Sequence, residues 1–268
     1  MEDFDHIAHL YDEDFTFSEI GKLQRERVWL YLDSILPKDK TLDILELNCG
    51  TGEDAARFAE RGHRVLATDI SPKMVDVAKT KSEQRGFANL VESQTLNIAT
   101  LNPTLLNGRK FDWVFSNFGG LNCLNTQDLQ YFAANLPKIL KPNGRFIAVV
   151  MPDACLWERF YFLFKGNKEE AYRRFNKSGI PVPVEGKMVH TWYYSPTDFR
   201  NFFEKEFKFK GQKPIGLFVP PSYLEFYFGK RKGLLKGLSF FEGTFGGIGS
   251  LSKFADHFLC DFVVEPYQ

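Results

Sequence analysis

The sequence has few of the features that mark metal, disulfide or membrane proteins. Its four cysteines are scattered without C-x-x-C spacing, so neither a zinc site nor a disulfide framework is predicted. It contains no apolar run of about 18 residues, and its first residues are acidic, unlike those of a signal peptide. Basic and acidic residues number 34 each, so no positive excess indicates a nucleic-acid partner. We expect a cytoplasmic protein with no metal, nucleic acid or membrane partner.

The sequence also lacks the H-E-x-x-H, P-loop and nucleophile-elbow strings, so dependence on a metal is not predicted. No internal repeat is present. Its 268 residues, of which 44% are hydrophobic and 25% charged, are ordinary for a globular enzyme of one large or two small domains.

The most informative segment is a polar turn at residues 46–53 that contains two glycines. The run of residues 41–45 is short and apolar, as a buried parallel strand should be. The apolar residues within 54–60 are spaced as in a helix. Gly50 and Gly52 let the backbone approach a ligand that a Cβ atom would exclude. A strand, a glycine turn and a helix in this order are typical of a cofactor-binding site.

Two cofactor classes fit this turn. Residues 50–55 match the dinucleotide fingerprint G-x-G-x-x-A, which taken alone favours an NAD-linked oxidoreductase. The carboxylates of Glu46, Glu53 and Asp54 argue against NAD, because a pyrophosphate needs bare N–H groups at a helix N-terminus. An acidic turn favours a cationic ligand such as S-adenosylmethionine, which carries a sulfonium and an ammonium group.

The string Glu46-x-Asn48-x-Gly50-x-Gly52 resembles the acidic-x-Gly-x-Gly-x-Gly motif of the class I S-adenosylmethionine-dependent methyltransferases. Asn48 stands where the family usually has its first glycine. Since Asn is among the few side chains that tolerate positive φ, we expect the turn to persist. The resemblance implies S-adenosylmethionine as the cofactor and these four residues as part of its site.

The second predicted strand, residues 63–69, ends in an acid. An acid about 20 residues after the glycine turn suits a ribose diol, so Asp69 is the candidate ribose-binding residue. A capping role for Asp69 is disfavoured, because Ser71 already supplies a helix cap. By resemblance, Ile70 and Met74 flank the adenine, although core packing is an alternative for Met74.

Residues 90–96 and 110–116 read as the third and fourth strands. By resemblance, Asn97 and Ile98, which follow the third strand, contact the adenine. Asn117 follows the fourth strand, at the sheet edge where ligands of open parallel sheets bind. It is a candidate contact of the cofactor or the acceptor, with an ordinary loop residue as the alternative.

Strands and helices alternate from residue 41 to a fifth strand at 145–151. We therefore predict an α/β, doubly wound, mostly parallel seven-stranded sheet of the Rossmann-like methyltransferase fold, with an α/β cap inserted after strand five. The predicted parts are an N-terminal lid and helix (1–40), a cofactor-binding core (41–151), an acceptor cap (152–195) and a completion of the sheet (196–268) with antiparallel strands near 208–218 and 254–264.

Two residues of the N-terminal part are of interest. By resemblance, Tyr11 covers the cofactor as part of a lid, and such lids exclude water when the ligand arrives. Arg25 could meet the carboxylate of the cofactor, but a solvated helix face is the favoured interpretation of this residue.

The second half of the chain is rich in aromatic residues, with 27 of the 42 after residue 151. An aromatic cap favours a flat or apolar acceptor, because buried rings supply contact area with few rotors. A dimer interface, hence a homodimer, and plain core packing are the alternatives. For a general base the candidates are His190, on a predicted cap strand, and His257, beside Asp256. A structural imidazole is the ordinary alternative for both.

These features together predict a methyltransferase that transfers a methyl group from S-adenosylmethionine to a small, aromatic or apolar acceptor by in-line displacement. An NAD-linked oxidoreductase and a non-catalytic S-adenosylmethionine-binding protein are the alternatives. The latter is left open because Asn48 replaces a glycine and no base is firmly assigned.

Overall fold

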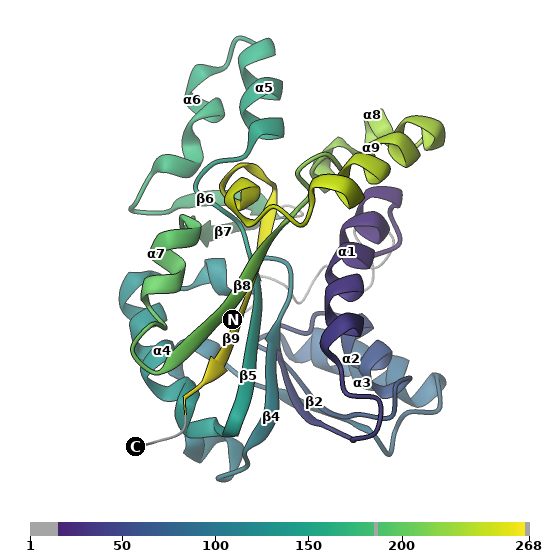
Figure 1. The fold of residues 1–268 in the computed structure, drawn as a ribbon, viewed down its shortest axis with the longest axis vertical. Helices are drawn as coiled ribbons and strands as arrows, with labels where there is room; N and C mark the ends of the chain where they lie inside the picture. Colours follow the sequence, from purple (N-terminus) through teal and green to yellow (C-terminus); the bar gives the residue numbers. More distant parts are fainter. Residues whose placement is uncertain (1–15, 185–186, 266–268) are drawn as a thin grey trace.

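A seven-stranded sheet lies at the centre of the computed structural model, which describes residues 16–184 and 187–265 (Figure 1). Its strands are β1 (Asp43–Leu47), β2 (Arg64–Asp69), β3 (Val91–Thr95), β4 (Phe111–Ser116), β5 (Leu140–Val150), β8 (Phe207–Ile215) and β9 (His257–Val264). Their order is β3-β2-β1-β4-β5-β9-β8; the first five run parallel, and β9 runs antiparallel to both neighbours. The predicted fold class is confirmed.

Helices cover both faces of the sheet (Figure 1). They are α1 (Glu19–Ile35), α2 (Glu53–Ala59) and α3 (Pro72–Gln84) on one face, and α4 (Thr126–Ile139) and α7 (Pro196–Asn201) on the other. Successive residues of β5 point to opposite faces, as strand geometry requires. Phe146 packs in the cluster that contains Phe132 of α4, whereas Ile147 packs in the cluster that contains Trp29 of α1 and Phe58 of α2.

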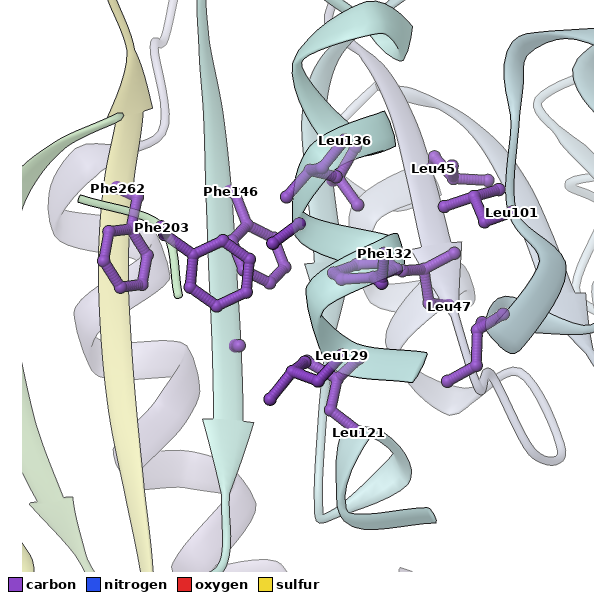
Figure 2. Close-up of a cluster of buried hydrophobic side chains, with 14 of the residues drawn as sticks. Leu45, Leu47, Leu101, Leu121, Leu129, Phe132, Leu136, Phe146, Phe203 and Phe262 are labelled. Carbon is purple, nitrogen blue, oxygen red and sulfur yellow. The ribbon is translucent and has the colours of Figure 1, made fainter. Parts of the chain in front are cut away.

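Part of the aromatic excess in the second half of the chain belongs to this core. Figure 2 shows Phe146, Phe203 and Phe262 side by side, next to Phe132 and Leu136 of α4. The ring centroid of Phe146 lies 5.0 Å from that of Phe203 and 5.9 Å from that of Phe262. Burial of each such ring contributes about 1.5–3 kcal/mol relative to an exposed one. The sheet edge made by β9 and β8 is therefore held largely by phenylalanine.

An α/β cap follows β5, as predicted. It contains α5 (Leu156–Phe164), α6 (Lys168–Ala171) and the antiparallel pair β6 (Ile180–Val184) and β7 (Lys187–Thr191). The pair leads into Trp192, whose backbone N–H donates to the Asn122 carbonyl at 2.8 Å. This hydrogen bond attaches the cap to the loop that follows β4.

Two helices between β8 and β9 were not predicted from the sequence. They are α8 (Glu225–Phe228) and α9 (Lys232–Phe245), and they lie near the start of α1 (Figure 1). The Glu225 carboxylate accepts hydrogen bonds from the backbone N–H groups of Glu19 and Ile20, at 3.1 and 3.0 Å. Ile20 also packs against Leu235. These contacts fix the first turn of α1.

Short 3-10 turns lie between the longer elements. They cover Ile98–Thr100, Pro103–Leu106, Gly120–Cys123, Arg173–Phe175, Ser222–Leu224 and Gly249–Phe254. Within the described ranges, no helix has both the length and the apolar character needed to cross a membrane.

Candidate active site

A cavity of about 470 Å³ opens where β1 to β5 end, next to the point at which the strand order reverses between β1 and β4. Ligands of open α/β sheets bind at such a point, and the volume suits a cofactor-sized ligand. The structure brings nine of the residues predicted from the sequence into its wall. These are Asn48, Gly50, Asp69, Ile70, Met74, Asn97, Ile98, Asn117 and His190.

The turn after β1 has the geometry that its sequence predicts. Asn48, Gly50 and Gly52 all have positive φ, at 55°, 53° and 77°, so Asn48 adopts the conformation of the glycine that it replaces. The Asn48 side chain lies against the loop after β4, where a Cβ atom on Gly120 would come within 2.3 Å of it. The turn after β1 and the loop after β4 therefore pack closely against each other on this side of the cavity.

Gly52 is not among the residues that line the cavity. A Cβ atom at this position would lie 2.7 Å from Cβ of Ala78 on α3. Because real Cβ contacts are never this short, the glycine is needed for α3 to pack against the start of α2. The structure places Gly52 in helix packing, behind the ligand-facing part of the turn.

Both carboxylate oxygens of Asp69 are held in place by the backbone. Oδ2 accepts a hydrogen bond from the N–H of Gly50 at 3.0 Å, and Oδ1 accepts one from the N–H of Ser71 at 2.9 Å. The side chain is buried at the end of β2 and lines the cavity. Each oxygen of a carboxylate can accept more than one hydrogen bond, so this fixed group suits a diol.

The expectation of an acidic turn is wrong for two of its three carboxylates. Glu53 forms ion pairs with Lys81 at 3.4 Å and Arg85 at 2.9 Å, and Asp54 pairs with Arg25. The favoured interpretation of Arg25 as a solvated residue is also wrong, because the structure buries it between this carboxylate and the ring of Phe118. Helices α1 and α3 thus supply cations that the local sequence does not show.

Asp54 also organises neutral partners. It accepts hydrogen bonds from Trp29 Nε1 at 2.6 Å and from Asn117 Nδ2 at 2.9 Å. Asn117, in turn, accepts the N–H of Phe118 at 3.0 Å while lining the cavity. The Asn117 side chain therefore positions the loop after β4, in addition to facing the ligand space.

Glu46 lies on β1 beneath the turn and is buried. Burial, reinforced by the carboxylates of Asp54 and Asp69, raises the pKa of Glu46 well above its ordinary value, although Arg25 lowers it. Within the described part of the chain, its Oε2 atom makes no hydrogen bond. A buried carboxyl group with an unsatisfied oxygen and a raised pKa marks a functional-site candidate.

The cap forms the wall that faces the sheet edge. Residues 189–192 line the cavity, and the rings of His190 and Trp192 lie 4.4 Å apart. Asn122 holds this wall, because its Nδ2 donates to the carbonyls of Trp192 at 2.6 Å and Met151 at 3.1 Å. Tyr194 lies in the core instead, with its hydroxyl donating to the Leu124 carbonyl.

The two histidines that were candidate bases have different surroundings. His190 lines the cavity, with Nε2 3.1 Å from the carbonyl oxygen of Ser178. His257 does not line it: this side chain is buried, its ring meets that of Phe118 edge-on at 5.5 Å, and its Nδ1 lies 3.2 Å from Asp256. Tyr11, the predicted lid residue, lies outside the described residues.

Sequence reasoning missed several residues of the wall. Phe118 has a φ of 45°, unusual for a bulky side chain, and nothing in the sequence indicates it. Met151 could have been found, since it ends the fifth predicted strand at the same sheet edge where Asn117 follows the fourth. Phe118, Cys123, Leu124, Met151, Val189 and Thr191 add a largely apolar surface to the polar edge made by the turn.

Comparisons with known proteins agree with this geometry. A family model described as methyltransferase domain matches residues 44–144. The tRNA 5-carboxymethoxyuridine methyltransferase of Escherichia coli (strain K12) is 33% identical over 88 residues, which are 32% of this chain and 34% of that protein. The ubiquinone/menaquinone biosynthesis C-methyltransferase of Teredinibacter turnerae is 31% identical over 172 residues, 61% and 65% of the two chains. This chain thus spans between about a third and two thirds of the length of these relatives.

A further relative, the magnesium-protoporphyrin O-methyltransferase of Rhodobacter capsulatus, is 27% identical over 187 residues, 66% of this chain and 74% of that protein. Among solved structures, a complex of DhpI with SAH superposes with a TM-score of 0.60 at 14% identity and covers 98% of this chain and 94% of that one. This likeness shows a shared fold.

Proposed function

Through residues 44–144, the chain belongs to the class I S-adenosylmethionine-dependent methyltransferases, and from this membership we propose that it methylates a small acceptor with an aromatic or other flat, apolar portion. One observation carries the proposal. A single cavity joins the polar edge made by Asn48, Gly50 and Asp69 to an apolar wall built around Trp192. The first side suits the cofactor, and the second suits an acceptor.

The residues at the polar edge fit S-adenosylmethionine. Asp69 would hold the ribose hydroxyls, since two backbone N–H groups already fix its carboxylate. Ile70, Met74, Asn97 and Ile98 would enclose the adenine, because they line the cavity beside Asp69. When bound, the cofactor supplies a methyl group activated by its sulfonium.

The methionyl end would lie toward the turn. Gly50 exposes its backbone to the cavity there. A Cβ atom on Gly120 would clash with the Asn48 side chain, so the turn and the loop after β4 already pack as closely as they can. Glu46 lies beneath, and its unsatisfied Oε2 is a hydrogen-bond acceptor near the position that an ammonium group would need. Arg25 and Asp54 would keep this region electrically balanced.

The acceptor would bind against the cap. Trp192 offers a ring face on which an acceptor can stack. Because Asn122 forms hydrogen bonds with both the N–H and the carbonyl of Trp192, stacking costs little further conformational entropy of the protein. Leu124, Met151 and Val189 extend the apolar surface and exclude water. For an in-line displacement, alignment of the nucleophile with the methyl carbon supplies much of the rate enhancement.

His190 would act as the base where the attacking atom carries a proton. A carbonyl oxygen can only accept, so the contact of Nε2 with the Ser178 carbonyl places the ring hydrogen of a neutral imidazole on Nε2. Nδ1 then carries the lone pair and can take a proton from the acceptor. His257 has no comparable access, since it lies behind Phe118.

The relatives' names differ in their acceptors, which include a tRNA, a quinone and a porphyrin. All three are methyltransferases by name, and together they fix no acceptor for this chain. The choice of a small, flat molecule rests on the wall made by Trp192 and its neighbours.

Methyl transfer to a panel of small aromatic molecules tests the proposal, with the variant Trp192→Ala compared against wild type. Loss of the ring should lower kcat/KM about a hundredfold, from lost burial and stacking of roughly 3 kcal/mol. The affinity for S-adenosylmethionine should not change.

The control is Tyr131→Ala, which removes an exposed ring on α4 away from the cavity. It should leave turnover and cofactor affinity intact. Turnover that is insensitive to Trp192→Ala, or methylation of tRNA and of no small molecule, would contradict the proposed acceptor class.

A further inference from the structure

The α8–α9 region presents apolar side chains to solvent. Helix α9 has 14 residues and buries only Leu235 and Glu242 among them. Phe226 on α8 is 80% exposed and Phe240 on α9 is 71% exposed. Isolated exposed rings are common, but a helix that leaves Leu234, Phe240, Phe241 and Phe245 exposed together indicates a surface with a binding role.

The charges of this region are sorted between its two sides. Its two acids face inward: Glu225 accepts the first N–H groups of α1, and Glu242 accepts four backbone N–H groups of residues 216–219, at 2.7 to 3.2 Å. Its four bases are exposed, and one of them, Lys232, lies 3.8 Å from Glu19. These bases are Lys230, Arg231, Lys232 and Lys236. The outer side is therefore apolar and cationic, although the whole chain has no net charge.

Helix α5 of the cap extends this surface. The ring of Trp157 meets that of Phe228 at 5.4 Å, and the ring of Tyr161 lies 6.4 Å from that of Tyr227. Beyond these contacts, Phe164 at the end of α5 is 95% exposed. Figure 1 shows α5, α8 and α9 at the same end of the molecule as β6 and β7, which belong to the cap.

We propose that this surface, made of α8, α9 and the exposed end of α5, binds membranes that contain anionic phospholipids. Phenylalanine and leucine side chains flanked by lysines suit the boundary between headgroups and acyl chains. The basic residues suit the negative surface potential of such a membrane. A second copy of the chain fits poorly, because two cationic surfaces would face each other. A nucleic acid would meet the bases but leave Phe226 and Phe240 without an apolar partner.

This inference departs from the sequence-based expectation of no membrane partner and does not depend on the proposed methyl transfer. Flotation of the full chain with lipid vesicles tests it. The protein should float with vesicles of phosphatidylcholine and phosphatidylglycerol, and weakly or not at all with phosphatidylcholine alone. Salt should weaken the binding, because it screens the exposed charges.

Two double variants test the basic residues and the exposed aromatic residues of the surface separately. Lys232→Gln with Lys236→Gln should weaken binding to the anionic vesicles roughly 25-fold, since each basic residue near such a membrane strengthens binding about fivefold. Phe226→Ser with Phe240→Ser should weaken it by at least about tenfold, through lost apolar burial. Lys205→Gln with Lys208→Gln removes two exposed charges at the start of β8 and serves as the control.

Several outcomes would overturn the inference. One is the absence of flotation with anionic vesicles. Another is flotation that neither double variant weakens, or that the control weakens as much. RNA binding or dimerisation that both double variants abolish, without any vesicle binding, would assign the surface to a nucleic acid or to a second copy instead.

Discussion

At the scale of single residues, the glycine turn acts through backbone geometry. Asn48 and Gly50 curve the chain around the cavity with positive φ, and Gly52 uses the same conformation to admit α3. The two glycines of the motif therefore have different reasons to be glycine: close approach to the ligand at Gly50 and close approach of a helix at Gly52.

This distinction predicts the effect of alanine at Gly52. Any side chain in the left-handed region costs about 1–2 kcal/mol, and the contact with Ala78 should add about 1–3 kcal/mol of overpacking. Gly108→Ala is the matched control, because Gly108 has a φ of 70° and a Cβ atom there would have no neighbour within 4 Å. Urea unfolding measures both variants. Equal losses of stability would mean that the contact with α3 does not require glycine.

At this scale, the places of residues that belong to local sequence patterns could be predicted, whereas their roles toward the cofactor stay predictions. Asn48 and Asp69 could be read from the sequence, because a turn and a strand end are local patterns. The pairing of Asp54 with Arg25, and of Glu53 with Lys81 and Arg85, could not. Those partners come from other helices, and a sequence shows charges without showing which of them meet.

At the scale of elements, a buried charge cluster ties the cap to the sheet. Arg174, after α6, donates to Glu158 of α5 at 2.9 Å and to Asp256, next to β9, at 3.0 Å. All three side chains are buried. The cluster fixes the base of the cap, whose other end supplies the Trp192 wall.

Arg174→Met should therefore destabilise the protein by about 3 kcal/mol or more, because it leaves two buried carboxylates without their shared cation. Arg109→Met is the control: its partner Glu92 and Arg109 itself are both largely exposed, so the loss should stay below about 1 kcal/mol. Thermal and urea unfolding report the difference. Similar small losses in both variants would show that the cluster does not anchor the cap.

The strands of the core could be predicted because each is a short apolar run between polar turns. Helices α8 and α9 could not, since α9 buries two of its 14 residues and contains several glycines, which blurs the apolar period of a helix. The exposed apolar side chains that made α9 hard to predict from the sequence are also the reason for proposing that it binds a membrane.

At the scale of the whole molecule, sheet topology separates the two cofactor classes that the glycine turn left open. The usual dinucleotide-binding sheet has the order 3-2-1-4-5-6. Here the last strand, β9, inserts between β5 and β8 and runs antiparallel to both. The family match over residues 44–144 agrees with the methyltransferase alternative.

The net charge of the whole chain does not indicate which partners its surface can bind. The 34 bases and 34 acids balance over the chain, yet the acids around α9 face inward and its bases face outward. The expectation of no membrane partner came from the lack of an apolar run long enough to span a bilayer, whereas binding at a membrane surface depends on how charges are distributed over the protein surface.

The central claim is that the cavity beside Asp69 binds S-adenosylmethionine, and calorimetric titration of the full chain with S-adenosylmethionine, S-adenosylhomocysteine and NAD tests it most directly. The first two should bind and NAD should not. Asp69→Ala should weaken binding about ten- to a hundredfold, as expected for lost hydrogen bonds to a charged group. Asp76→Ala, which removes an exposed carboxylate on α3, should leave it unchanged. Binding of NAD alone, or binding that Asp69→Ala does not weaken, would contradict the account.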